Sequence, residues 1–268
     1  MTRKTIVSLV LLLGLLAFAQ ADVVYYEDFE GNWEDDWYAD FGTWEVGTPT
    51  SGPGAAYGGS NCLATILAGN YPSTALTKFI KISSILIPAA NQYPRLTFWE
   101  WFSFNEHVDC RDHGKVMIRP VGSTDWTQLG ANKIRYSGSV WVYTVYDLAA
   151  YSGQSVQIAF MLDVADTAYG GDEDWGWYID NIEIMTGQPV FNNPEGWENG
   201  IGDWYADNGQ WQVGTSSQVS AYQGSNCLAT ILNTSYSHNA ASRMISPEFS
   251  VPAANQYPRL TFWEWFSF

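Results

Sequence analysis

The chain has 268 residues, with 12 Lys and Arg against 28 Asp and Glu, and a formal net charge of −16. So acidic a protein is not expected to bind nucleic acid, because phosphate backbones are bound by clustered Lys and Arg. Its 14 Trp and 16 Tyr exclude a disordered chain and can build a hydrophobic core. The acidity suits cation binding through carboxylates, although it also serves solubility.

The first predicted element is a secretory signal peptide over residues 1–21. Arg3 and Lys4 provide the positive start, residues 6–18 are apolar, and Ala19-Gln20-Ala21 fits a cleavage site between small residues. The apolar run is too short to span a membrane, and no second long apolar segment follows it. We therefore expect a secreted or surface-displayed protein without a membrane span, whose mature chain starts at Asp22.

After the signal peptide, strand patterns recur between turn residues, and helical periodicity is nearly absent. In QSVQIAFML, apolar side chains from Val156 to Leu162 alternate with mostly polar ones, as in a half-buried antiparallel strand. About nine strands in roughly 160 residues predict an all-β fold, an antiparallel β-sandwich of the jelly-roll type. The predicted strands are 23–29, 42–47, 60–67, 76–82, 94–104, 114–119, 141–147, 154–163 and 176–185.

The tract RLTFWEWFSF, residues 95–104, has aromatic residues on both faces of its predicted strand. Such a strand is either central and covered on both sides, or its second face is a platform for a ligand. Burial is the preferred interpretation, because Trp is usually a core residue. One face holds Leu96, Phe98, Glu100, Phe102 and Phe104, and the other holds Arg95, Thr97, Trp99, Trp101 and Ser103. If aromatic side chains do bind carbohydrate, the candidate residues are Trp99, Trp101, Trp126 and Trp141.

The chain repeats itself at an offset of 164 to 167 residues. A repeat of this length is too long for a solenoid and indicates a duplicated domain. The repeated tracts are DWYAD at 36–40 and 203–207, GSNCLATIL at 59–67 and 224–232, and PAANQYPRLTFWEWFSF at 88–104 and 252–268. The predicted division is a first module at 22–186, a linker at 187–196, and the N-terminal half of a second, homologous module at 197–268.

The cysteines predict one disulfide. Cys62 and Cys227 are equivalent in the repeat, and Cys110 has no counterpart before residue 268. In an exported protein we expect a Cys62–Cys110 bond, with the partner of Cys227 beyond the given sequence. The second module is accordingly expected to be truncated, as in a fragment of a longer protein.

Several motifs occur in a characteristic order: DFEG at 28–31, PRLTFWEWF at 94–102, YDLAAYSGQSVQIAFML at 146–162 and WGWYIDNIEI at 175–184. In this order the chain resembles the MAM-like and cleaved-adhesin-like modules of bacterial secreted and surface proteins, which accompany immune-inhibitor-A-type peptidases and adhesins. The resemblance implies a concanavalin A-like jelly roll with a binding or structural role and no chemistry of its own.

The resemblance also implies a structural calcium site. In modules of this kind an acid at the end of the first strand, here Glu30, meets an acid in the last strand, here Asp180. Two converging carboxylates favour a hard cation such as calcium. Asp28 is a possible further ligand, and Glu198 is the counterpart of Glu30 in the second module. The alternative is a pair of solvated surface carboxylates.

No catalytic motif is present in the sequence. Both G-x-S-x-G and H-E-x-x-H are missing, and the chain has three His residues. We therefore expect a non-catalytic binding or adhesion protein of tandem calcium-stabilised modules that recognises a glycan or a surface protein. One alternative is a set of accessory modules in a larger secreted hydrolase, such as a metallopeptidase. Another is a structural stalk. Neither the ligand nor the oligomeric state is predicted.

Overall fold

The computed structural model describes residues 22–73, 75–105, 112–134, 137, 140–164, 173–237 and 241–268. The predicted signal peptide and Cys110 lie outside these residues. Within the described part of the chain, no helix is long and apolar enough to cross a membrane.

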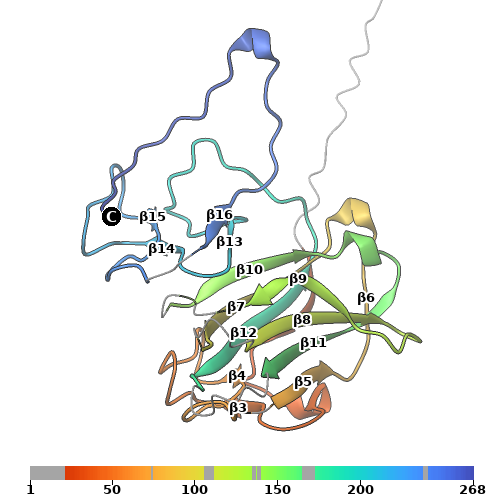
Figure 1. Ribbon diagram of the computed structural model, residues 1–268. Helices are drawn as coiled ribbons and strands as arrows, with labels where there is room; N and C mark the ends of the chain where they lie inside the picture. Colours follow the sequence, from red (N-terminus) through yellow and green to blue (C-terminus); the bar gives the residue numbers. More distant parts are fainter. Residues whose placement is uncertain are drawn as a thin grey trace, which may run out of the picture.

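The first repeat folds into two six-stranded sheets that face each other, and all strand pairs are antiparallel (Figure 1). Sheet A consists of β1 (Val23–Glu27), β3 (Glu45–Gly47), β4 (Cys62–Ala64), β7 (Arg95–Ser103), β10 (Val142–Asp147) and β12 (Gly176–Met185). Sheet B consists of β2 (Trp37–Ala39), β5 (Ala75–Lys81), β6 (Ile85–Leu86), β8 (His113–Pro120), β9 (Thr127–Lys133) and β11 (Ser155–Val164).

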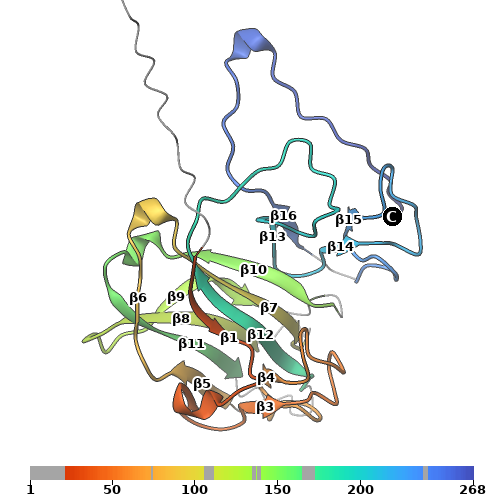
Figure 2. The same ribbon diagram turned by 180° about the vertical axis from the view of Figure 1, so that it is seen from behind.

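The strand order is β10-β7-β12-β4-β3 in sheet A, with β1 paired to β12, and β2-β5-β11-β8-β9 in sheet B, with β6 paired to β11. Seen from behind, β1 lies along β12, so the start and the end of the module are neighbours (Figure 2). Three short 3-10 helices, η1 (Trp33–Asp35), η2 (Ala90–Gln92) and η3 (Ala149–Tyr151), connect strands. The predicted antiparallel β-sandwich is confirmed.

All nine predicted strands are present, but three strands were not predicted. Two of them, β2 and β6, have three and two residues and are too short for a pattern. The third, β9, contains Gly130 at φ 65°, which is typical of a turn. A Cβ at Gly130 would lie 2.5 Å from Cε1 of Tyr146, so the glycine lets this strand approach the opposite sheet.

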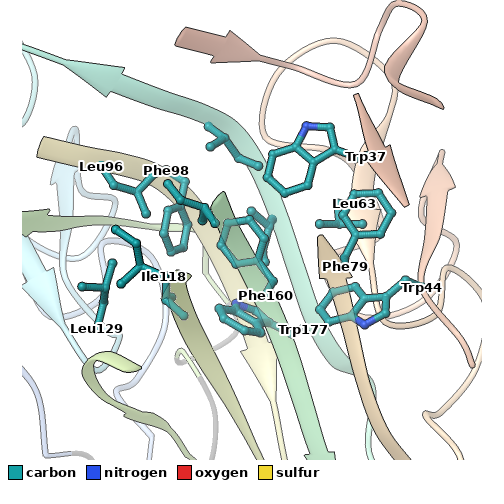
Figure 3. Close-up of a cluster of buried hydrophobic side chains, with 14 of the residues drawn as sticks. Trp37, Trp44, Leu63, Phe79, Leu96, Phe98, Ile118, Leu129, Phe160 and Trp177 are labelled. Atoms are coloured by element: carbon teal, nitrogen blue, oxygen red, sulfur yellow. The ribbon is translucent and has the colours of Figure 1, made fainter. Parts of the chain in front are cut away.

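The core lies between the two sheets and combines aromatic side chains with Leu, Ile and Val (Figure 3). Phe160 of β11 makes edge-to-face contacts with Phe98 of β7 and Trp177 of β12, at centroid distances of 5.2 and 5.6 Å. Trp37 stacks on Phe79 at 5.4 Å. Each large apolar side chain buried in this way contributes about 1.5–3 kcal/mol, so this core is a major source of stability.

Strand β7 is central, as the sequence predicted, and all of its residues except the half-buried Trp99 are buried. It is hydrogen-bonded to β10 on one side and β12 on the other. Leu96, Phe98 and Phe102 face the main core. Trp101 faces outward, into a separate buried cluster with Cys62 and Tyr178.

A buried ion pair connects the sheets inside the core. Nζ of Lys133 in β9 donates to Oε1 of Glu100 in β7 at 2.5 Å, and Nε1 of Trp177 donates to Oε2 at 3.0 Å. Burial raises the pKa of Glu100. Burial alone would lower the pKa of Lys133, but the neighbouring carboxylate outweighs this effect and raises it.

The second repeat has two small antiparallel pairs among its described residues: β13 (Tyr205–Asp207) with β16 (Arg243–Ile245), and β14 (Gln212–Gly214) with β15 (Cys227–Ala229). It also contains η4 (Ala254–Gln256). Nη2 of Arg95 in β7 binds Oδ1 of Asp203 at 3.0 Å, which ties the second repeat to the first. The predicted module boundaries stay predictions.

The tract of 17 identical residues has two conformations. In the first repeat it forms η2 and β7, and Phe98 is fully buried. In the second repeat it forms η4 and then no strand, and the equivalent Phe262 is 70% exposed. The first copy has β10 and β12 as hydrogen-bonding partners. Strand formation here therefore depends on neighbouring strands more than on intrinsic propensity.

Candidate functional site

Four aromatic side chains gather on the outer face of sheet A, and we call them the aromatic face: Tyr57, Trp99, Trp141 and Tyr143. Tyr57 stacks on Trp99 with ring centroids 3.8 Å apart and planes at 12°. Trp141 meets the Tyr57 ring at 64° and 6.2 Å, and Tyr143 lies 5.3 Å from Trp99. Tyr57 is 41% exposed in spite of its stack, so part of its ring faces water.

Different elements supply these rings. Trp99 points outward from the middle of β7, and Tyr143 lies directly opposite it on β10. Directly opposite residues of an antiparallel pair share a face of the sheet. Trp141 precedes β10, and its Nε1 donates to the carbonyl oxygen of Ala55 at 3.3 Å. Tyr57 comes from the segment between β3 and β4.

A buried carboxylate holds Tyr57 in place. The backbone N–H groups of Tyr57 and Gly58 both donate to Oδ2 of Asp180 at 3.0 Å, and the N–H of Asn181 donates to Oδ1 at 2.8 Å. Asp180 is fully buried. Burial, with a contribution from the charge of Glu30, raises the pKa of Asp180 to about 6 in spite of these hydrogen bonds.

Glu30 holds the other end of the same segment, Tyr57–Asn61, which we call the tyrosine loop. Oε1 of Glu30 accepts the N–H groups of Ser60 at 2.6 Å and Asn61 at 2.7 Å. The bonds from Asn61 and Ser60 lower the pKa of this exposed carboxyl. Gly59 has φ 59°, a left-handed conformation that favours glycine, and a Cβ there would lie 2.4 Å from Oε1 and displace the Glu30 carboxylate.

A β-bulge beside the tyrosine loop shapes this part of sheet A. The register between β12 and β7 shifts between Asp180 and Glu183, and Asn181 within the shift has φ 49°. Asn tolerates this left-handed conformation better than most residues. Oδ1 of Asn181 accepts the hydroxyl of Tyr26 at 3.2 Å. The bulge thus places polar side chains next to the aromatic face, as bulges near functional sites often do.

The four predicted ligand-binding tryptophans do not form one group. Trp99 and Trp141 belong to the aromatic face. Trp101 is 2% exposed and lies edge-on against Tyr178, so it offers a ligand almost no surface. Trp126 lies outside sheet B, where Arg119 stands over its ring at 4.5 Å. The structure therefore brings Trp99 and Trp141 together at the aromatic face, packs Trp141 also against the buried cluster of Trp101, and separates Trp126 from the other three.

Tyr57 and Tyr143 were missed as site residues. A tyrosine in a loop has no periodicity, and the only available signal was its recurrence, since AAYGG at 55–59 returns as SAYQG at 220–224. Tyr143 reads as an ordinary strand residue in the sequence.

Glu30 and Asp180 do meet at one loop, although the structure shows main-chain N–H groups as their partners. Among the described residues, no three or more His, Cys, Asp or Glu side chains converge as a metal cluster. Asp28 is close, since its Oδ1 accepts the N–H of Glu30 at 3.2 Å. Two carboxylates, one of them fully buried, are a donor set that suits a hard cation completed by main-chain oxygens and water.

The second repeat reproduces the Glu30 arrangement. Oε1 of Glu198 accepts the N–H groups of Ser225 at 2.8 Å and Asn226 at 2.9 Å. The bonds from Asn226 and Ser225 lower the pKa of Glu198.

Cys62 directly follows the tyrosine loop and is fully buried, and burial raises the pKa of its thiol, with Asp180 and Glu30 adding to the effect. Neither Cys62 nor Cys227 forms a disulfide with another described residue. Because Cys110 lies outside the described residues, the Cys62–Cys110 bond stays a prediction.

No protein-family model matches the chain. Over 186 residues it is 31% identical to Bacillopeptidase F of Bacillus subtilis (strain 168), an alignment that covers 66% of this chain and 12% of the relative. The chain thus spans only about an eighth of that peptidase. The more specific MAM-like assignment stays a prediction.

Solved structures with similar folds include three carbohydrate-binding modules. The CBM22-1 xylan-binding domain of Paenibacillus barcinonensis Xyn10C is 16% identical with a TM-score of 0.40, covering 63% of this chain and 97% of that one. TmCBM61 in complex with beta-1,4-galactotriose is 13% identical with a TM-score of 0.37, and the match covers 60% of this chain and 99% of that one. CBM6cm-2 of Cellvibrio mixtus lichenase 5A, in complex with cellotriose, is 15% identical with a TM-score of 0.35, and the match covers 62% of this chain and 98% of that one. Similarity at this level does not identify a ligand.

Proposed function

We propose that the chain belongs to a secreted, non-catalytic binding protein whose first module recognises a polysaccharide through the outer face of sheet A. The observation that carries the proposal is the exposed Tyr57 ring, stacked on Trp99 and fixed by a buried carboxylate. Aromatic faces bind the apolar C–H surfaces of sugar rings. A ring that is already held in position loses little conformational entropy on binding.

The carboxylates at this site are poorly placed for catalysis. A general acid or base must reach the reacting atoms of a substrate. Asp180 is fully buried, and its oxygens accept three main-chain N–H groups. Oε1 of Glu30 is likewise occupied by the tyrosine loop. Both acids therefore serve to shape the binding surface.

A sedimentation assay with insoluble polysaccharides tests the proposal. The purified protein is mixed with cellulose, chitin and insoluble xylan, and the bound fraction and the reducing sugar released are measured, with serum albumin as a control. We expect retention on at least one polysaccharide without release of sugar. Retention no greater than that of albumin on every polysaccharide would contradict the proposal, and release of sugar would contradict its non-catalytic part.

A second candidate function is that of accessory modules in a larger secreted peptidase. The similarity to part of Bacillopeptidase F favours this alternative over a stalk. It does not favour a metallopeptidase in particular. Sequencing the DNA on both sides of these codons would decide: a peptidase domain in the same reading frame supports the alternative, whereas further repeats support an adhesin-like array.

We propose calcium as a structural ligand of the carboxylate-held loops. Glu30 and Asp180 would bind it in the first module, with Asp28 as a further ligand, and Glu198 would bind it in the second. What supports the proposal is that Glu30 and Asp180 bind the same loop, and that burial together with the charge of Glu30 raises the pKa of Asp180. A bound cation would relieve the cost of burying that charge.

A further inference from the structure

The stack of Tyr57 on Trp99 occurs a second time in the chain. Tyr222 and Trp263, the equivalent residues of the second repeat, stack with centroids 4.0 Å apart and planes at 14°. The first pair has 3.8 Å and 12°. Trp99 belongs to a strand, whereas Trp263 does not, so the pairing is made by the rings and the loop, independently of the sheet.

The anchoring of the tyrosine is duplicated as well. Glu30 binds the N–H groups of Ser60 and Asn61, and Glu198 binds those of Ser225 and Asn226 at nearly the same distances. Each repeat therefore contains a carboxylate, a loop fixed by it, and a tyrosine stacked on a tryptophan.

Both tyrosines are exposed. Tyr57 is 41% and Tyr222 is 67% accessible although one face of each ring lies on a tryptophan. Packing alone would favour covering such rings, because apolar surface left in water forgoes about 25 cal/mol per Å². A rigid, half-exposed tyrosine is instead typical of binding surfaces, where it supplies contact area at a low entropic cost.

The charges near the first pair, together with the net charge of the chain, favour an uncharged ligand. Near Tyr57 lie the carboxylates of Glu30 and Asp180, which both accept main-chain N–H groups of the tyrosine loop. Arg95, which lies on the same face of β7 as Trp99, is paired with Asp203. With a net charge of −16, the protein would repel an acidic polysaccharide, whereas a neutral one bears no such penalty.

We propose that Tyr57–Trp99 and Tyr222–Trp263 are two stacking sites for sugar rings of one neutral polysaccharide, so that the two repeats bind it bivalently. This inference rests on the proposed function, which it extends to a ligand class and to both repeats. Linking two weak sites raises the apparent affinity by about 10²–10⁴ through effective concentration. Loss of either site should therefore remove most of the binding.

Affinity gel electrophoresis measures this effect directly. The whole chain is run in gels containing hydroxyethylcellulose, soluble xylan or mannan, with polygalacturonate as the acidic probe. We expect Tyr57→Ala and Tyr222→Ala each to weaken retardation in the neutral gels by about 10²-fold, and the double variant to show none. Tyr57→Phe, which keeps the ring, should bind like the wild type.

Tyr38→Ala is the matched control, since Tyr38 is a 44% exposed tyrosine on the outer face of sheet B. It should leave retardation unchanged. Nitration with tetranitromethane gives a second readout that needs no variant. We expect the bound neutral polysaccharide to protect Tyr57 and Tyr222, but not Tyr38, in peptide mass spectra.

The results of these experiments distinguish an error in the two stacking sites from an error in polysaccharide binding itself. If the wild type is retarded, Tyr57→Ala binds equally well and nitration of Tyr57 is not reduced, the inference is wrong while polysaccharide binding stands. Retardation only by polygalacturonate also overturns the inference. If the wild type is retarded by none of the gels, both are wrong.

Discussion

At the scale of single residues, Asp180 is a carboxylate that main-chain N–H groups keep out of water. Three main-chain N–H groups solvate it, yet burial raises its pKa from 3.8 to about 6. A pKa that is higher in the folded than in the unfolded state means that the native protein binds the additional proton. The contribution of Asp180 to stability is therefore largest at low pH and falls as the pH rises from about 4 to about 6.

This gives a prediction for Asp180→Asn, measured in calcium-free buffer. The asparagine does not titrate, so the difference in Tm between wild type and variant isolates the proton on Asp180. We expect the advantage of the wild type to shrink between pH 4 and pH 6.5 and then to level off. A difference that stays constant over this range, or grows with pH, would show that Asp180 is ionised throughout.

Sequence reasoning at this scale succeeded where a pattern existed. The alternation in β7 correctly placed Phe98 and Trp99 on opposite faces of the strand. It could not show that Trp101 is covered while Trp99 stays partly accessible, because Trp175 and Tyr178, which pack on Trp101, come from another part of the chain. The carboxylate that fixes Tyr57 is 123 residues away, a distance that no local motif spans.

At the scale of elements, the repeated tract shows that its intrinsic strand propensity is not enough to form a strand without neighbouring strands. The same residues form β7 between two partner strands and form no strand in the second repeat. The long strands with regular alternation could therefore be predicted, since their patterns reflect burial on a sheet. The short strands β2 and β6 could not, because two or three residues define no period.

The contact between the two sheets is close at Gly114 of β8, where a Cβ would lie 2.6 Å from Cε3 of Trp177. Because the indole is fully buried and cannot move aside, Gly114→Ala should destabilise the protein by about 1–3 kcal/mol. Urea unfolding followed by fluorescence measures the change. Gly31→Ala is the control, with no atom within 4 Å of the added methyl group. Equal effects of the two substitutions would argue against this packing.

The buried ion pair of Glu100 and Lys133 predicts a large loss of stability when only one partner is replaced. Glu100→Gln leaves Lys133 buried without its counter-charge, which should cost about 3–5 kcal/mol in urea unfolding. Replacing both, as Glu100→Leu with Lys133→Met, should recover much of the loss, since an apolar pair needs no partner.

The matched control is Lys78→Ala, which breaks a more accessible pair with Asp40 and should cost no more than about 1 kcal/mol. A loss no larger for Glu100→Gln than for Lys78→Ala would indicate that the core pair is hydrated.

At the scale of the whole molecule, the duplicated carboxylate-held loops predict a common response to calcium. At a hundredfold excess over its Kd, a ligand bound only by the folded state adds about 2.7 kcal/mol. That corresponds to a rise in Tm of several degrees for a protein of this size.

We therefore expect EGTA to lower the Tm and added calcium to restore it. Glu30→Gln together with Glu198→Gln should abolish the response, whereas Glu34→Gln, at an exposed acid, should keep it. An unchanged Tm on chelation would exclude the calcium proposal and leave the loops held by their N–H groups alone.

The most direct measurement is a titration of the ¹⁵N-labelled protein with an oligosaccharide cut from the neutral polysaccharide that retards it most, followed at the indole N–H signals by NMR. Single Trp→Phe variants assign the signals. If the outer face of sheet A is the binding surface, the signals of Trp99 and Trp141 shift on titration and that of Trp126 does not. A shift confined to Trp126, on the opposite sheet, would contradict binding at the aromatic face.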